Sequence, residues 1–213
     1  MEDPVKDAAS QKSEKQKMLD GEWFVTPNFE LARLHTRAQK LVQDYNALPP
    51  FDLKGRAATL NRLLHQIGEG TNIEPPFFVD YGFNVSIGRN SYINLSCIMI
   101  DGNTITIGDG VILSPGVRLL TTEHPISKAP QIEETPDGIR CFSRALPIEI
   151  QDNAWLGAGV TVLAGVTIGK NSVIGAGSVV TKSIPEGVLA VGAPCKVLRE
   201  LPDSSQIVPE PTT

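Results

Sequence analysis

One histidine stands apart from the others in this chain. His124 lies in the segment TTEHPI, whereas His35 and His65 lie far upstream. An imidazole has an unperturbed pKa of about 6.5, so at neutral pH it can take a proton from a hydroxyl group that attacks another molecule. A single histidine in a loop is more often a surface residue than a catalytic one. The elements that would hold His124 in place therefore have to be identified first.

The segments on both sides of His124 carry an apolar residue at every sixth position. After His124 this ladder is unbroken and consists of Ile150, Leu156, Val162, Ile168, Ile174 and Val180. Four places after each of these comes a second ladder of mostly small or β-branched residues, namely Ala154, Val160, Val166, Ser172, Ser178 and Ile184. Before His124 the first ladder continues through Ile87, Ile93 and Met99 and then, after a slip of two residues, through Ile107, Leu113 and Leu119.

A period of six matches neither a helix, which repeats near 3.6 residues, nor a single strand, which repeats at 2. The same segments are rich in Val, Ile, Thr and Gly, which favours short strands separated by tight turns. Such short units bury their apolar face only by stacking on one another. The sequence therefore predicts a β-solenoid in which three six-residue faces make one coil and the ladders point into a narrow prism.

The period fails between Leu119 and Ile148. The intervening segment, residues 122–147, has no usable repeat and contains ETPDG, which is typical of a turn. A loop of this length inside a compact fold is usually functional or disordered. We expect an extruded loop that gates the substrate, with His124 at its root, where a rigid coil holds the side chain. Glu123 is a poor partner for His124, because neighbouring side chains in an extended segment point apart.

The N-terminal part, residues 17–70, is expected to be helical. One helical face carries Leu31, Leu34, Ala38, Leu41, Val42 and Tyr45, and a second carries Ala57, Leu60, Leu63, Leu64 and Ile67. Thr26 followed by Pro27 resembles the start of the first helix, and GEG at 68–70 is expected to stop the second. The apolar face of this pair must pack on another element. We expect a disordered polar leader over 1–16, the solenoid over 71–201 and a polar tail over 202–213.

Composition excludes several classes of function. The net charge of −5, with both signs interspersed, provides no basic stripe for nucleic acid, and no apolar run approaches the length of about 20 residues that spans a membrane. The first residues contain no apolar segment typical of a secretory signal. Three cysteines without metal-ligand spacing fit reduced, mostly buried thiols in a cytoplasmic protein.

These repeats and their shared interruption resemble the hexapeptide-repeat acyltransferases, and most closely the galactoside and maltose O-acetyltransferases, a group that includes the nodulation acetyltransferases. The matching segments are KMLDGEWF and residues 74–101, 106–126 and 148–201. The resemblance implies a left-handed parallel β-helix, a homotrimer with cofactor grooves between subunits, and transfer of an acetyl group from acetyl-CoA to a sugar hydroxyl. It requires no metal.

The resemblance also implies roles for individual residues. His124 would be the general base for direct attack on the thioester, without an acyl-enzyme. The acceptor would contact Asp80, Tyr92, Asn94 and Asp101. Acetyl-CoA would contact Trp155, Ala158, Ala176, Thr181, Lys182, Lys196 and Arg199. One departure bears on the acceptor: galactoside acetyltransferases carry an acidic residue shortly after the segment that matches GEWF, where this chain has Val25 and Thr26.

Four other functions are known for solenoids of this kind or for the chemistry of a loop histidine. A carbonic anhydrase on the same solenoid needs three histidines on zinc, but two of the three histidines here lie in the helical segment. A sugar nucleotidyltransferase would need a glycine-rich βαβ unit, which the sequence lacks. A xenobiotic acetyltransferase, acting on other hydroxyl acceptors with a loop histidine, and a non-enzymatic assembly protein built on the same coils both remain open.

Overall fold

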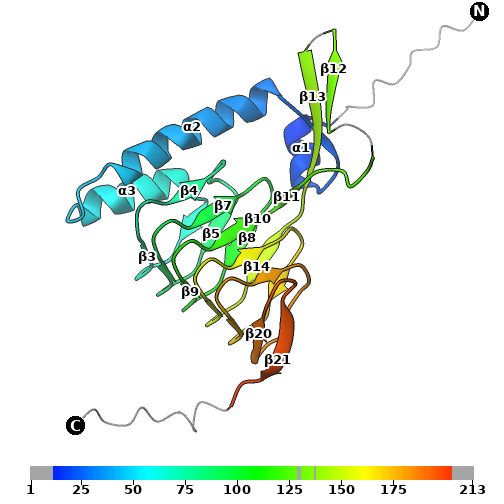
Figure 1. Ribbon diagram of the computed structural model, residues 1–213. Coiled ribbons are helices and arrows are strands. Elements are labelled where there is room, and N and C mark those ends of the chain that lie inside the picture. Colours follow the sequence, from blue (N-terminus) through cyan, green and yellow to red (C-terminus); the bar gives the residue numbers. More distant parts are fainter. Residues whose placement is uncertain (1–11, 129–130, 137, 203–213) are drawn as a thin grey trace, which may run out of the picture.

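The computed structural model describes residues 12–128, 131–136 and 138–202. A tapering stack of coils forms the body, helices cover its first coil, and a β-hairpin projects from one edge (Figure 1). The predicted β-solenoid is therefore confirmed. None of the described helices has the length and apolar character needed to cross a membrane.

The body consists of three sheets whose strands alternate along the chain and pair in parallel, except that the last strand, β21, pairs antiparallel with β20. The first sheet contains β2 (Gln66–Ile67), β5 (Val85–Ile87), β8 (Ile105–Ile107), β14 (Ile148–Ile150) and β17 (Thr167–Ile168). The second contains β3 (Asn72–Ile73), β6 (Tyr92–Ile93), β9 (Ile112–Leu113), β15 (Trp155–Leu156), β18 (Val173–Ile174), β20 (Val188–Val191) and β21 (Lys196–Glu200). The third contains β4 (Phe78–Val79), β7 (Ile98–Ile100), β10 (Arg118–Leu120), β16 (Thr161–Val162) and β19 (Val179–Val180).

Both predicted ladders point into the prism. All six residues from Ile150 to Val180 in the first ladder are 0% exposed, and the second ladder from Ala154 to Ile184 is also buried. Burial of these aliphatic side chains provides the main stabilisation of the stack. The outward positions of the first sheet are polar, whereas those of the second include Tyr92, Ile112 and Trp155, each more than a third exposed.

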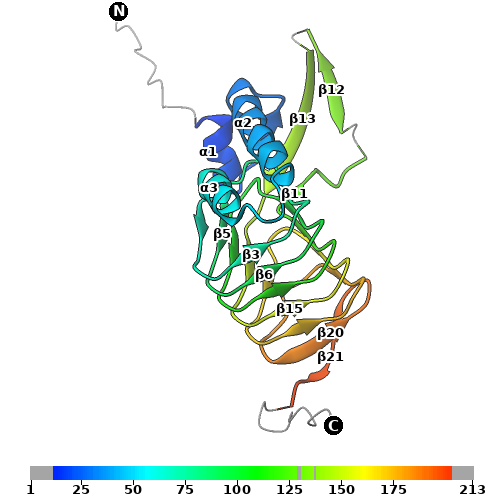
Figure 2. The ribbon, with the colours of Figure 1, turned by 90° about the vertical axis from the view of Figure 1, so that its left-hand side faces the viewer.

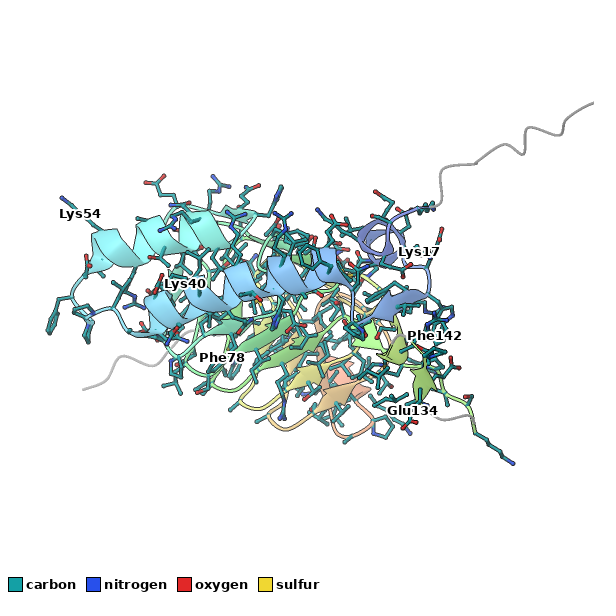
Figure 3. The ribbon with its side chains drawn as sticks, turned by 90° about the horizontal axis from the view of Figure 1, so that it is seen from above. Lys17, Lys40, Lys54, Phe78, Glu134 and Phe142 are labelled. Carbon is teal, nitrogen blue, oxygen red and sulfur yellow. The ribbon has the colours of Figure 1, made fainter. Side chains whose placement is uncertain are left out.

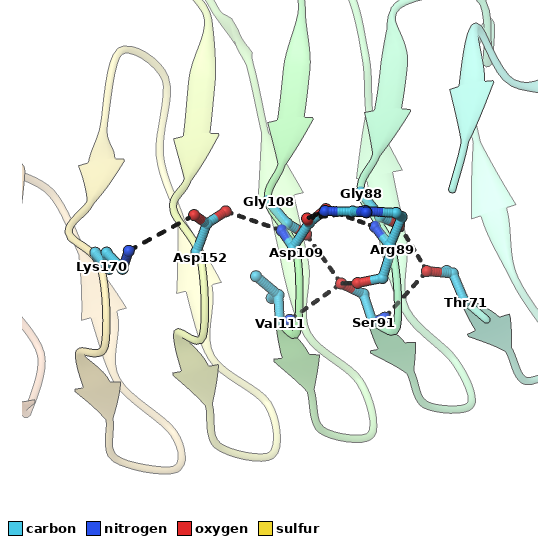
Figure 4. A network of polar contacts seen from close by, with 9 residues as sticks. All are labelled: Thr71, Gly88, Arg89, Ser91, Gly108, Asp109, Val111, Asp152 and Lys170. Carbon is cyan, nitrogen blue, oxygen red and sulfur yellow. Dashed lines mark hydrogen bonds and ion pairs between the residues drawn. The ribbon is translucent and has the colours of Figure 1, made fainter. Parts of the chain in front are cut away.

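The corner between the first and second sheets shows why glycine recurs in the repeat (Figure 4). Asp109 Oδ1 accepts a hydrogen bond from the backbone N–H of Arg89 at 2.7 Å, and Asp152 Oδ1 accepts one from Asp109 at 2.9 Å. A Cβ at Gly88 or Gly108 would lie 2.4 Å from these same carboxylate oxygens. Each coil thus closes the turn of the preceding one, and only glycine leaves room for the carboxylate.

Three helices lie at the N-terminal end: α1 (Glu14–Leu19), α2 (Phe29–Asn46) and α3 (Leu53–Leu63). Helices α2 and α3 cover the first coil, so their apolar faces pack where the sequence required a partner (Figure 2). Polar side chains of α2 also bind the backbone of that coil. Gln39 Nε2 donates to the Val79 carbonyl at 2.7 Å, Tyr45 Oη donates to the Ile73 carbonyl at 2.5 Å, and Asn46 both donates to and accepts from Phe77.

Three predicted boundaries were wrong. Asn28, not Thr26, caps α2 through its side chain, because Thr26 belongs to strand β1 (Phe24–Thr26). Helix α3 ends at Leu63, and β2 pairs in parallel with β5, so the solenoid begins at Gln66 rather than at residue 71. The leader was expected to extend to residue 16, but Ser13 caps α1 from Glu14 onward. Residues 1–11 of that leader and 203–213 of the tail lie outside the described residues.

The interruption in the repeat is an antiparallel hairpin rather than an irregular loop. It contains β11 (Thr122–Glu123), β12 (Ile132–Thr135) and β13 (Gly138–Ala145). β13 pairs with β12, with β11 and with β1, where Val25 lies opposite Phe142. Seen from above, Phe142 therefore lies beside the N-terminal segment (Figure 3). The hairpin joins the first residues of the fold to the middle of the solenoid.

Candidate active site

The candidate site lies along one edge of the prism, at the corners that follow the third sheet. Asp80 follows β4, Asp101 follows β7 and His124 follows β10 and β11. Because neighbouring parallel strands end at the same edge, these corners are stacked. The two-residue slip between Met99 and Ile107 falls at this edge and widens the corner that contains Asp101. The departure from the six-residue period therefore marks the place of the site.

His124 and Asp80 line the same cavity, which has a volume of about 400 Å³. The N-terminal segment and the hairpin contribute Thr26 and Ser143 to its wall. The remaining lining residues are Met18, Phe24, Tyr81, Ile100, Gly102, Leu120 and Thr122. The cavity thus combines a carboxylate, an imidazole and hydroxyl groups with an apolar wall, and residues far apart in the sequence enclose it.

Strand β13 contacts one nitrogen of His124. The Nδ1 atom lies 3.0 Å from the Phe142 carbonyl oxygen, 3.4 Å from Ser143 Oγ and 3.6 Å from Cys141 Sγ. A carbonyl oxygen only accepts hydrogen bonds, so in the neutral ring Nδ1 carries the proton and Nε2 keeps its lone pair. Nε2 is then the nitrogen that can accept a proton. Glu123 pairs with Arg144 at 2.8 Å and is directed away from this arrangement.

Asp80 is half-buried, and burial raises the pKa of its carboxyl group above the ordinary value, while nearby His35 lowers it. His35 Nε2, on α2, lies 3.9 Å from Asp80 Oδ1. The backbone of Asp80 is fixed on both sides: its N–H donates to Asp101 Oδ1 at 3.0 Å, and its carbonyl accepts from Gln39 at 3.3 Å.

Asp101 does not face the cavity. Its side chain is fully buried, and its carboxylate accepts the backbone N–H groups of Asp80, Tyr81 and Asn84. Burial raises the pKa of Asp101 to about 7. The expected contact between Asp101 and an acceptor does not fit this placement. Asp101 instead shapes the turn that carries Asp80.

The other residues expected to contact an acceptor lie elsewhere on the chain. Tyr92 is on the second sheet and 38% exposed, and Asn94 is at the corner between the second and third sheets. The Asn94 side chain accepts the backbone N–H of Leu95 at 2.8 Å. Neither residue lines the cavity of His124, so a single chain does not bring the whole expected set together.

The residues expected to bind acetyl-CoA are all exposed and form three groups. Trp155 and the two alanines, Ala158 and Ala176, lie on the second sheet or at its following corner, where Trp155 Nε1 donates to Ser114 Oγ at 3.0 Å. Thr181 and Lys182 follow β19, on the edge that carries His124. Lys196 and Arg199 lie on β21. Their roles in binding stay predictions.

Sequence reasoning missed three contributors to this site: His35, the Phe142 carbonyl and Cys141. His35 reaches Asp80 from a helix, and β13 reaches His124 across a hairpin, so no local pattern reports either contact. Within the described residues, no group of three His, Cys, Asp or Glu side chains is arranged to hold a metal ion.

Comparison with known proteins agrees with this architecture. Residues 147–182 match the family model of the bacterial transferase hexapeptide (six repeats), and residues 17–68 match that of the maltose acetyltransferase hexapeptide capping motif. Galactoside O-acetyltransferase of Escherichia coli K12 is 38% identical over 188 residues, which cover 88% of this chain and 89% of the relative.

Two solved structures extend the comparison. A galactoside acetyltransferase in complex with coenzyme A is 36% identical, covers 92% of this chain and 94% of its own, and has a TM-score of 0.83. A hexapeptide-repeat acetyltransferase of Vibrio cholerae, complexed with acetyl coenzyme A, is 33% identical and has a TM-score of 0.80. The match covers 90% of this chain and 100% of the Vibrio chain. The chain therefore belongs to the hexapeptide-repeat acetyltransferases, in the group of the galactoside and maltose O-acetyltransferases, and its solenoid is the left-handed parallel β-helix of that family.

Proposed function

We propose that this protein transfers the acetyl group of acetyl-CoA to a hydroxyl of a sugar such as maltose, glucose or a galactoside, with His124 as the general base. The observation that carries this proposal is the contact between His124 Nδ1 and the Phe142 carbonyl, in a cavity that also contains Asp80. Complexes of two relatives with coenzyme A or acetyl coenzyme A support the choice of donor.

In the proposed reaction, the acceptor hydroxyl attacks the thioester carbonyl while His124 Nε2 takes its proton. The carbon–oxygen bond forms, and the tetrahedral oxyanion collapses with cleavage of the carbon–sulfur bond. The CoA thiolate then takes the proton back from the imidazolium, so the base is regenerated and no acyl-enzyme forms. The Phe142 carbonyl keeps Nε2 available and stabilises the imidazolium that forms during attack.

The cavity supports a sugar as the acceptor class. A carboxylate accepts hydrogen bonds from hydroxyl groups, which makes Asp80 a suitable partner for the sugar. Met18, Phe24, Ile100 and Leu120 provide an apolar wall for the C–H face of a pyranose ring. Thr26 lines the same cavity, and neither Val25 nor Thr26 supplies the acidic residue that galactoside acetyltransferases carry near this point. We therefore place the carboxylate that binds the acceptor at Asp80.

We further propose that the protein acts as a homotrimer. The apolar outward face of the second sheet, with Tyr92, Ile112 and Trp155, supports burial against a second copy, whereas the polar first sheet suits solvent. His124 and Asp80 lie at the edge that follows the third sheet, whereas Tyr92 lies on the second sheet and Asn94 at its following corner, so a site that uses all four would combine two subunits. A monomeric mass by light scattering at micromolar concentration would refute this assembly. We also place the protein in the cytoplasm, where its three free cysteines would stay reduced.

The test is an acceptor screen. Purified protein is incubated with acetyl-CoA and with glucose, maltose or isopropyl β-thiogalactoside, and release of free thiol and formation of the acetylated sugar are measured. We expect turnover of at least one sugar. Chloramphenicol and serine are the comparison acceptors: preferential acetylation of chloramphenicol would replace the sugar proposal by a xenobiotic acetyltransferase. Failure of every acceptor would favour an assembly protein.

A further inference from the structure

The pair formed by His35 and Asp80 lies beside the cavity of His124 and has no role in the proposed proton transfer. His35 Nε2 and Asp80 Oδ1 are 3.9 Å apart, and both side chains are partly exposed. The His35 ring also meets Tyr81 edge to face, with a centroid distance of 6.1 Å and an interplanar angle of 76°. Tyr81 in turn packs against Phe83 at 5.6 Å. The imidazole is thus held by an aromatic neighbour while its Nε2 is directed to the carboxylate.

The main chain of Asp80 is held in place by contacts that do not involve His35. Asp101 and Met99 accept its N–H, and Gln39 binds its carbonyl. What these contacts leave undetermined is the rotation of the Asp80 side chain. Among the described residues, His35 brings a ring nitrogen to 3.9 Å from this carboxylate, where its imidazolium form would pair with the charge. The turn therefore fixes the position of Asp80, and His35 is left to orient its carboxylate oxygens.

We propose that His35 is a positioning residue of the acceptor site, which holds the Asp80 carboxylate in the orientation that binds a sugar hydroxyl. The inference rests on the proposed function, since it assumes that Asp80 contacts the acceptor. It predicts a specific kinetic effect. Without His35, the Asp80 carboxylate turns among several rotamers, so acceptor binding weakens while His124 and the proton transfer stay intact.

The test separates orientation from packing. His35→Phe keeps a ring against Tyr81 but has no N–H group, whereas His35→Gln restores an N–H donor on the side facing the carboxylate. His65→Phe is the matched control, because His65 is exposed and lies between α3 and β2, outside the residues that line the cavity. KM and kcat are measured for the best acceptor among glucose, maltose and isopropyl β-thiogalactoside, with acetyl-CoA at saturation.

We expect His35→Phe to raise the acceptor KM about fivefold, as for a partly exposed ion pair, with kcat and the KM for acetyl-CoA unchanged. His35→Gln should recover most of the loss. In an Asp80→Asn background, His35→Phe should have no further effect, because the two residues act as one unit. An acceptor KM that is unchanged in His35→Phe, or that rises equally in both backgrounds, overturns the inference while sugar acetylation stands. If the wild type acetylates no sugar, the proposed function fails first and this inference falls with it.

Discussion

Replacing His124 is the most direct test of the proposed chemistry. His124→Ala should lower kcat by roughly 10²–10⁴, the usual loss when general acid–base catalysis is removed. At about 1.4 kcal/mol for each tenfold change, this corresponds to roughly 3–6 kcal/mol in the activation free energy. The assay is thiol release from acetyl-CoA with the best sugar acceptor at saturation.

The structure limits how much stability the same change can cost. The His124 side chain is exposed, and its shortest polar contact is the one to the Phe142 carbonyl, at 3.0 Å. A hydrogen bond of this kind contributes about 1 kcal/mol or less, so the melting temperature should fall by no more than about 4 °C. Binding of CoA, measured by calorimetry, should be retained. A loss of activity with this small thermal shift separates chemistry from folding.

A second variant distinguishes the base from its orientation. His124→Asn keeps an N–H donor for the Phe142 carbonyl but has no nitrogen that accepts a proton. It should therefore be as inactive as His124→Ala. His65→Ala serves as the neutral control. His35→Ala is unsuitable as a control, because His35 lies 3.9 Å from Asp80 although it is distant in sequence. Near-normal turnover by His124→Ala or His124→Asn would show that another group takes the proton.

Three further outcomes are expected. Burial raises the pKa of Asp101 from 3.8 to about 7, so between these pH values the folded chain keeps a proton that the unfolded chain releases. The free energy of unfolding of the wild type, measured in urea, should therefore fall relative to that of Asp101→Asn as pH rises from about 4 to about 7. The same pH dependence in both proteins would contradict this placement of Asp101. Alkylation of Cys141 with iodoacetamide should abolish turnover, because its sulfur lies 3.6 Å from His124 Nδ1. Cys141→Ser should protect the enzyme from this loss, since the buried Cys97 and Cys195 should react slowly. Replacing residues 132–139 by a two-residue turn, which leaves the pairing of β13 with β1 in place, should shift the melting temperature by only a few degrees and lower turnover at least tenfold; unchanged turnover would contradict the predicted gating.

The sequence predicts the solenoid well because its signal is local and repeated. Each coil buries residues at the same positions, so the ladder through Ile150 and Val180 reports the prism directly. The interruption after Leu119 and the position of His124 at its root are also readable for this reason. The end of the helix at Leu63 could not be predicted in this way, because the apolar residue Ile67 suits a helix face and a solenoid strand equally well.

The contacts that complete the site depend on distant pairing. The carbonyl that binds His124 belongs to the main chain of Phe142, and any residue type could supply it. His35 approaches Asp80 only because α2 lies across the first coil. Asp101 looks like a polar ligand in the sequence, but it turns inward to bind three backbone N–H groups. Such roles depend on tertiary structure and produce no periodic pattern in the sequence.

The two ends of the stack have a consequence for solubility. A parallel solenoid ends in open strand edges, and an open edge is a template on which another molecule can add. At the first coil, Gln39, Tyr45 and Asn46 bind the carbonyl groups that a further coil would use, because the equivalent carbonyls of the next coil accept hydrogen bonds from the first. At the last coil, β21 reverses direction, pairs antiparallel with β20 and carries Lys196, Arg199 and Glu200. Truncation of either end should therefore convert a discrete particle into one that polymerises head to tail.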